Sequence, residues 1–158
     1  MRLHIALAAL LAMSASALAS GSGDHTHDEM AIGAPGDASK VTRSISVEMK
    51  ETSSGKMLFS PQRFTVREGD TIRIKFVNIG ETDHEFVMDT VEAVLEHKKL
   101  MEQFPEMEHD DPNAIRLQPG GKGEIIWTFT KPGDFAFGCL IPGHYEAGMK
   151  GDILVNGN

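Results

Sequence analysis

The chain of 158 residues contains a single cysteine, Cys139. One thiol cannot form a disulfide within the chain, so the fold must depend on a hydrophobic core, for which this length suffices. In an oxidising compartment an exposed lone thiol would oxidise or cross-link two chains. We therefore expect Cys139 either to be buried and inert or to be held by a bound group.

Basic residues are scarce relative to acidic ones. The sequence has 15 Lys and Arg against 23 Asp and Glu, which gives a formal net charge of −8 at pH 7. An acidic surface disfavours nucleic acid and anionic membranes as partners. It suits a basic protein partner or an environment rich in cations, and solubility alone explains it equally well.

The sequence also lacks an apolar run of the roughly 20 residues that a membrane-spanning helix requires. Its first stretch, "MRLHIALAALLAMSASALAS", has a basic residue, a short apolar segment and a small-residue site at Ala17–Ala19. This pattern is typical of a cleaved secretory signal, and the alternative is an uncleaved amphipathic anchor. We predict a signal peptide over residues 1–19, export of the protein, and no membrane span.

Residues 20–40 have little hydrophobic content and much Gly, Ser, Ala and Asp. They are predicted to form a flexible tail ahead of a domain over residues 41–158. From residue 41 onward, apolar and polar residues alternate with period two, which is typical of half-buried strands. The first strand should point Val41, Ile45, Val47 and Met49 inward. In the stretch 71–80, Ile72, Ile74 and Phe76 face one way, and Arg73 and Lys75 face the other.

The alternation is interrupted once, over residues 91–104, where Glu, Lys and Leu are frequent and apolar residues approach helical spacing. This segment is predicted to be a helical insertion that ends before Pro105. Strand patterns then return, with turn signals between them, up to the end of the chain. The sequence therefore predicts an all-β fold, an antiparallel Greek-key β-sandwich of seven to eight strands with one short helical insertion.

Three residues with metal-binding side chains lie in one glycine-rich loop, "FGCLIPGHYEAGM", over residues 137–149. Cys139 offers a thiolate, His144 an imidazole and Met149 a thioether. One Cys and two His in a plane, with a weak axial Met, hold copper for one-electron transfer. The second imidazole is expected from His84, because the other histidines of the exported chain lie in the tail or around the insertion: His25, His27, His97 and His109.

The stretches "NIGETDHEF" and "FGCLIPGHYEAGM" resemble the cupredoxins, the small copper proteins that include plastocyanin and azurin, and the resemblance extends over residues 41–157. It implies one type 1 copper with His84, Cys139 and His144 as equatorial ligands and Met149 as axial ligand. Glu85 departs from the Asn that often follows the first ligand in this family. The ligand loop is also longer than in plastocyanin, so blue and green centres stay open as alternatives. A binuclear centre is excluded because it needs two cysteines.

Further histidines and methionines are candidates for additional copper, since imidazole suits Cu(II) and thioether suits Cu(I). Packing is the alternative for methionine, which often fills cores. It is the simpler explanation for Met49, Met57 and Met88. A tail of this kind resembles the CopI-type copper-resistance cupredoxins of bacterial periplasms, which implies a periplasmic location. The additional candidates are His25, His27, Met30, His97, Met101, Met107 and His109.

The resemblance implies a role in copper tolerance through the binding, and as a further step the oxidation, of copper. The alternative is a single-copper electron carrier with an apolar docking patch of Leu140, Ile141 and Pro142 beside His144. A third hypothesis is a metal-free interaction domain with an inert buried cysteine. We do not expect an enzyme, because a type 1 site leaves no open position for a substrate. The expected partners are copper ions and a transient redox or copper-handling protein.

Overall fold

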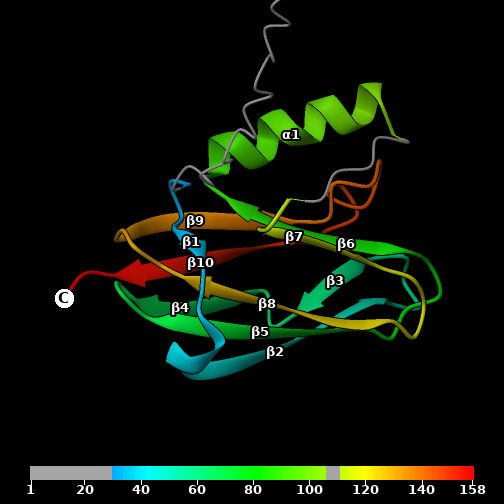
Figure 1. Ribbon diagram of the computed structural model, residues 1–158. Coiled ribbons are helices and arrows are strands. Elements are labelled where there is room, and N and C mark those ends of the chain that lie inside the picture. The colour runs from blue at the N-terminus through cyan, green and yellow to red at the C-terminus, as the bar shows by residue number, and fades with distance from the viewer. Residues whose placement is uncertain (1–29, 106–110) are drawn as a thin grey trace, which may run out of the picture.

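The computed structural model describes residues 30–105 and 111–158. Its elements are shown in Figure 1 and follow the predicted strand and helix patterns closely. In chain order they are β1 (Ala34–Pro35), the 3-10 turn η1 (Ala38–Lys40), β2 (Val41–Glu51), β3 (Met57–Ser60), β4 (Arg63–Arg67), β5 (Thr71–Asn78), β6 (His84–Asp89), α1 (Val91–Gln103), β7 (Ala114–Leu117), β8 (Lys122–Thr128), β9 (Gly133–Gly138) and β10 (Lys150–Asn156).

The strands form two sheets of five, with the orders β1-β8-β5-β2-β3 and β4-β10-β9-β6-β7. The sheets lie face to face (Figure 1), which confirms the predicted β-sandwich with one helical insertion. Pairing is mainly antiparallel, but β2 pairs parallel to β5 and β4 pairs parallel to β10. The sequence did not reveal these two pairs, because each joins strands that lie apart in the chain. The short strands β1 and β3 also add to the predicted number.

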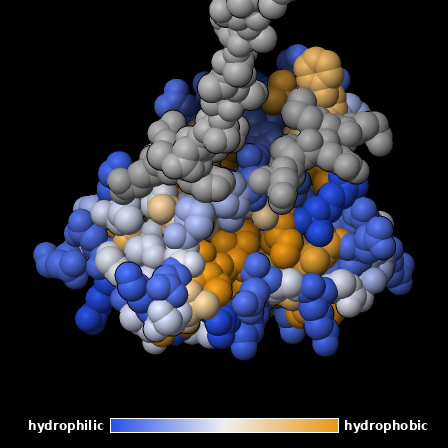
Figure 2. Space-filling view, viewed as in Figure 1, coloured by the Kyte–Doolittle hydropathy of each residue, from blue (hydrophilic) through white to orange (hydrophobic). Residues whose placement is uncertain are grey.

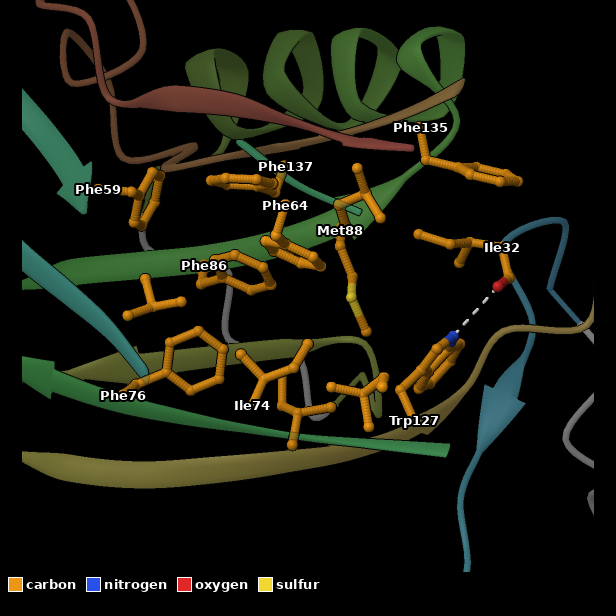
Figure 3. Close-up of a cluster of buried hydrophobic side chains, with 14 of the residues drawn as sticks. Ile32, Phe59, Phe64, Ile74, Phe76, Phe86, Met88, Trp127, Phe135 and Phe137 are labelled. Atoms are coloured by element: carbon orange, nitrogen blue, oxygen red, sulfur yellow. Dashed lines mark hydrogen bonds between the residues drawn. The ribbon is translucent and has the colours of Figure 1, made fainter. Parts of the chain in front are cut away.

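The core lies between the sheets, and the few aromatic residues of the chain are concentrated there (Figure 3). Phe86 on β6 is at its centre, with ring centroids 4.7 Å from Phe76, 5.0 Å from Phe137 and 5.6 Å from Phe59. Such contacts add to the stabilisation from burial of apolar area. The predicted inward positions Ile72, Ile74, Phe76, Val47 and Met49 are buried, whereas Val41 and Ile45 are only partly so.

The prediction of a flexible tail fails for residues 30–40, which pack on the sandwich. Ile32 is fully buried, and its carbonyl accepts a hydrogen bond of 3.3 Å from the Trp127 indole N–H (Figure 3). Strand β1 then pairs with β8, which would otherwise be the edge of its sheet. The gain from covering Trp127 with an apolar side chain explains why this segment is ordered. The rest of the predicted tail and the predicted signal peptide lie outside the described residues.

The helix α1 lies on the outer face of the second sheet (Figure 1). Its N-cap is Thr90, whose hydroxyl accepts a hydrogen bond from the Ala93 N–H. The helix turns Val94 and Met101 towards the sheet, where they form a small second core with three residues of β6, β9 and the following loop: Val87, Ala136 and Leu140. The insertion therefore packs on the reverse side of the strands that carry the main core.

The outer surface is mostly hydrophilic on the face that Figure 2 shows, with a hydrophobic area at its centre. Large apolar side chains are exposed on and next to α1, among them Leu95, Leu100 and Phe104. Within the part of the chain that the structure describes, no helix combines the length and the apolar character that crossing a membrane demands.

Candidate metal centre

The position of His84 depends on a loop that the buried residue Asn78 shapes. The Asn78 side-chain amide donates to the carbonyls of Thr82 and Leu117, at 2.8 and 2.9 Å, and its oxygen accepts from the Gly80 N–H at 2.9 Å. These bonds turn the chain after β5 and return it as β6, whose first residue is His84. The His84 side chain is thereby fully buried. Asn followed two residues later by Gly is a turn signal, but the sequence alone did not identify Asn78 as a support of the site.

The ladder between β9 and β10 closes the loop that carries the other predicted ligands. At its base, the Cys139 N–H donates to the Met149 carbonyl at 3.0 Å. Inside the loop, the Met149 N–H donates to the His144 carbonyl, also at 3.0 Å. Gly143 and Gly148 have φ angles of 88° and 107°, which favour glycine and permit the sharp turns. The short loop therefore holds Cys139, His144 and Met149 together by main-chain bonds.

Three predicted ligands converge on one point. The ligand atoms of His84, Cys139 and His144 all lie within 4.8 Å of one another. The two Nδ1 atoms are 3.3 Å apart, and the Cys139 Sγ is 3.4 Å from the His144 Nδ1. A metal ion about 2.0–2.3 Å from each donor fits such separations. One thiolate and two imidazoles are also the donor set that suits a trigonal copper site.

Met149 is the predicted axial ligand. It is fully buried in the main core, and its main chain is bonded to both Cys139 and His144. Its thioether is therefore carried by the same short loop as two of the converging donors. Coordination by Met149 stays a prediction.

Burial governs the protonation of the metal-free site. It raises the pKa of the Cys139 thiol to about 12, although the Glu85 main-chain N–H, which donates to Sγ at 3.3 Å, opposes this shift. Burial also lowers the pKa values of His84 and His144. At neutral pH the site therefore contains a thiol and two neutral imidazoles. Glu85 departs from the family pattern in its side chain, but here its main chain makes the contact with Cys139.

Glu51 is a site residue that the sequence did not suggest. Its Oε1 lies 3.1 Å from the Nε2 of His84, on the ring edge away from the converging donors. Burial alone would raise the pKa of Glu51, but hydrogen bonds from the Thr82 hydroxyl and from the Glu81 and Thr82 main-chain N–H groups lower it to about 2. The His84 Nε2 is buried, and the Glu51 carboxylate is the charged group that lies beside it, although the two atoms are not aligned as a hydrogen bond.

The exposed side of the site is formed by the ligand loop. His144 is half-buried, and Pro142 next to it is exposed. The predicted docking patch is wrong in one member, because Leu140 is buried beneath α1 and is not available to a partner. The insertion also contacts the ligand loop directly: the Lys98 Nζ lies 2.6 Å from the Glu146 Oε1.

Three of the candidates for additional copper, Met30, His97 and Met101, lie in the described part of the chain. Met101 is buried in the apolar cluster under α1, so packing explains it, and His97 is half-buried on the same helix. Met30 is half-buried against the main core. In the ranges 30–105 and 111–158, His84, Cys139 and His144 form the one group of potential His, Cys or carboxylate ligands. His25, His27, Met107 and His109 lie outside the described residues.

Comparison with known proteins identifies relatives of this arrangement. Residues 45–156 match the family model "Copper binding proteins, plastocyanin/azurin family". The chain is 46% identical over 134 residues to the copper-resistant cuproprotein CopI of Rubrivivax gelatinosus, covering 84% of this chain and 79% of that protein. It is 33% identical over 154 residues to the CopI of Pseudomonas aeruginosa, covering 79% of this chain and 82% of that one.

Among solved structures, the reduced auracyanin of Roseiflexus castenholzii matches with a TM-score of 0.61 and 28% sequence identity. The match covers 73% of this chain and 98% of that chain. The family model begins within β2, runs to the end of β10 and includes all three converging ligands. The donor set, the sandwich that positions it and these matches agree, and the chain belongs to the plastocyanin/azurin family of copper-binding proteins.

Proposed function

We propose that the protein is an exported, periplasmic copper protein that contributes to copper tolerance. The observation that carries this proposal is the convergence of ligand atoms from one buried thiol and two imidazoles within 4.8 Å. The similarity to copper-resistant cuproproteins over most of both chains supports the biological role. The ligands in this proposal are His84, Cys139 and His144, with Met149 in the axial position.

The frame around the site is suited to a metal that changes its oxidation state. When bound, copper supplies one-electron chemistry. His84 is fixed from β6, and Cys139 is tied at the end of β9 to the start of β10. Since these donors belong to a rigid sandwich, little structure has to move when the charge of the metal changes. Burial of Cys139 also keeps its thiol away from solvent and from a second chain.

Additional copper binding by the segment "HTHDEM" remains part of the proposal. The sequence supports copper binding by this segment, since two histidines and a methionine, His25, His27 and Met30, lie within six residues. Metal counting on the full-length exported protein and on a variant with His25, His27 and Met30 changed to Ala tests it. We expect more than one copper per chain in the first and one fewer in the second. Equal counts would remove this part of the proposal.

The tolerance role is tested in a host that lacks its own copper-resistance cuproprotein. Growth at raised copper should be restored by the wild-type gene and reduced with Cys139→Ser. Ser has nearly the size of Cys but offers no thiolate, so the fold should be preserved. Full restoration by Cys139→Ser, at equal protein level, would show that tolerance does not depend on this site.

Electron transfer to a protein partner is a second candidate, and the half-buried ligand His144 favours it. Electrons can pass through the exposed edge of such a ring, next to Pro142, without opening the site. This role predicts rapid electron self-exchange that slows when Pro142 is replaced by Glu. In copper tolerance, the same site would oxidise Cu(I) to Cu(II) and pass the electron to an acceptor. Loss of Cu(I) in the presence of a soluble oxidant measures it.

A further inference from the structure

We propose that Glu51 is a positioning residue for the copper site, which orients His84 and favours bound Cu(II) over Cu(I). The proposal rests on the copper site proposed above. Glu51 is the last residue of β2, while His84 begins β6 in the other sheet. The carboxylate therefore reaches from one sheet to a ligand of the other. No ligand atom of the site itself comes from Glu51.

The two nitrogens of His84 face different surroundings. Nδ1 points to the converging donors, 3.3 Å from the His144 Nδ1, and Nε2 lies 3.1 Å from the Glu51 Oε1. When Nδ1 binds a metal, the proton of the neutral ring must be on Nε2, next to the carboxylate. A carboxylate at the second nitrogen fixes the orientation of a ligand histidine and raises its basicity. The Glu51 carboxylate is an acceptor within 3.1 Å of the buried Nε2.

Glu51 is itself held in place before any metal binds. Oε1 accepts hydrogen bonds from the Thr82 N–H at 3.1 Å and from the Thr82 hydroxyl at 2.5 Å. Oε2 accepts from the Glu81 N–H at 2.9 Å. These bonds connect the carboxylate to the loop that immediately precedes His84. The charge therefore has a defined place beside the ring, unlike the charge of a freely rotating surface side chain.

The glycine at position 80 is a second, independent sign that this contact is built into the fold. A Cβ on Gly80 would lie 2.2 Å from the Glu51 Oε2 and 2.9 Å from the His84 Nε2. Both distances are shorter than real Cβ contacts, so a side chain at position 80 would push the carboxylate and the ring away from their present positions. Gly80 also donates its N–H to Asn78, which fixes its backbone in this position.

The expected effect follows from the charge difference between the two oxidation states. A fixed negative charge and a more basic imidazole stabilise Cu(II) more than Cu(I). Loss of such an outer partner weakens metal binding about 10–100-fold. If Cu(II) is weakened tenfold more than Cu(I), the reduction potential rises by about 59 mV for one electron.

The competing explanation is that Glu51 only fastens the loop 80–83 to β2. Two variants separate the explanations. Glu51→Gln keeps the size and removes the charge. Thr82→Val removes one of the hydrogen bonds that fasten the loop but leaves the carboxylate. Glu81→Gln is the matched control, because it removes an equal charge from the neighbouring exposed position.

The experiment compares the reduction potential and visible spectrum of the copper-loaded wild type and these variants, together with their thermal unfolding. Glu51→Gln should lower the ratio of the Cu(II) affinity to the Cu(I) affinity tenfold or more. The reduction potential should rise accordingly. Gly80→Ala should shift the potential in the same direction, since its Cβ pushes the carboxylate and the His84 Nε2 apart. Thr82→Val and Glu81→Gln should change the ratio less than threefold.

Equal shifts in Glu51→Gln and Glu81→Gln, or in Glu51→Gln and Thr82→Val, would overturn the proposal. So would an unchanged potential in Glu51→Gln. Failure of the copper site itself gives a different result, because the wild type would then show no thiolate-to-copper absorption band. If Glu51→Gln does not fold, Gly80→Ala decides: an unchanged potential in that variant overturns the proposal as well.

Discussion

Copper binding to this protein should release one proton from Cys139 at neutral and mildly alkaline pH. Burial raises the pKa of the metal-free Cys139 thiol to about 12. At pH 8 the ionisation of this thiol therefore costs about 5 kcal/mol, which the copper–sulfur bond has to offset. The two histidines contribute no proton there, because burial lowers their pKa values and leaves both rings neutral.

The number of protons released can be measured as the slope of the Cu(II) affinity against pH. With one proton displaced, the apparent affinity for Cu(II) should rise about tenfold for each pH unit between pH 7 and pH 9. Below the lowered pKa values of His84 and His144, protons compete for these rings as well, and the slope should become steeper. Calorimetry in two buffers with different ionisation heats counts the released protons directly. Zn(II), which has no redox chemistry and accepts sulfur and nitrogen ligands, provides a check without thiol oxidation.

The control is Cys139→Ser, in which binding should be much weaker and independent of pH in this range. An affinity for the wild type that does not change between pH 7 and pH 9 would refute the reasoning. It would show that the metal-free site already contains a thiolate, as in reactive cysteines with a lowered pKa.

Three further predictions concern packing and acid stability. Met101→Ala should lower the free energy of unfolding by about 2–5 kcal/mol in chemical denaturation, because Met101 is a core residue. The copper content should stay unchanged, and loss of a bound copper would contradict this. Ile32→Ala should have a similar cost, since Ile32 is fully buried over Trp127, and an unchanged midpoint would show that residues 30–40 do not stabilise the sandwich. The metal-free protein should lose stability between pH 7.5 and pH 5.5. The pKa values of His84 and His144 lie below the ordinary 6.5, so the unfolded chain takes up protons first as the pH falls. A free energy of unfolding that stays constant over this range would contradict the prediction.

Local sequence patterns were sufficient for the fold class and for the three converging ligands, but not for the two parallel strand pairs. The alternation of Ile72, Ile74 and Phe76 with charged residues predicts a half-buried strand, and these residues are buried in β5. Cys139 and His144 are close in the chain, so their common loop is visible in the sequence. His84 was found by its place at the start of a strand, and the structure puts its Nδ1 at the site.

The parts that the sequence did not predict depend on contacts between distant segments. Glu51 at the end of β2 meets Glu81 and Thr82 in the loop after the neighbouring strand β5, and no local spacing reports such a contact. Ile32 lies in a segment rich in Gly and Ala that shows no strand alternation, so its burial over Trp127 depends on the completed sheet. Met101 shares a helix with His97 as the spacing predicted, but the sheet below the helix decides that Met101 packs in a core.

The central claim is that His84, Cys139 and His144 hold one copper ion in a type 1 site. Titration of the purified metal-free protein with Cu(II), followed by visible absorption, tests it most directly. The account predicts an intense thiolate-to-copper band that saturates with one copper at this site and is absent in Cys139→Ser. A protein that stays colourless through the titration, or a band of equal strength in Cys139→Ser, would contradict it.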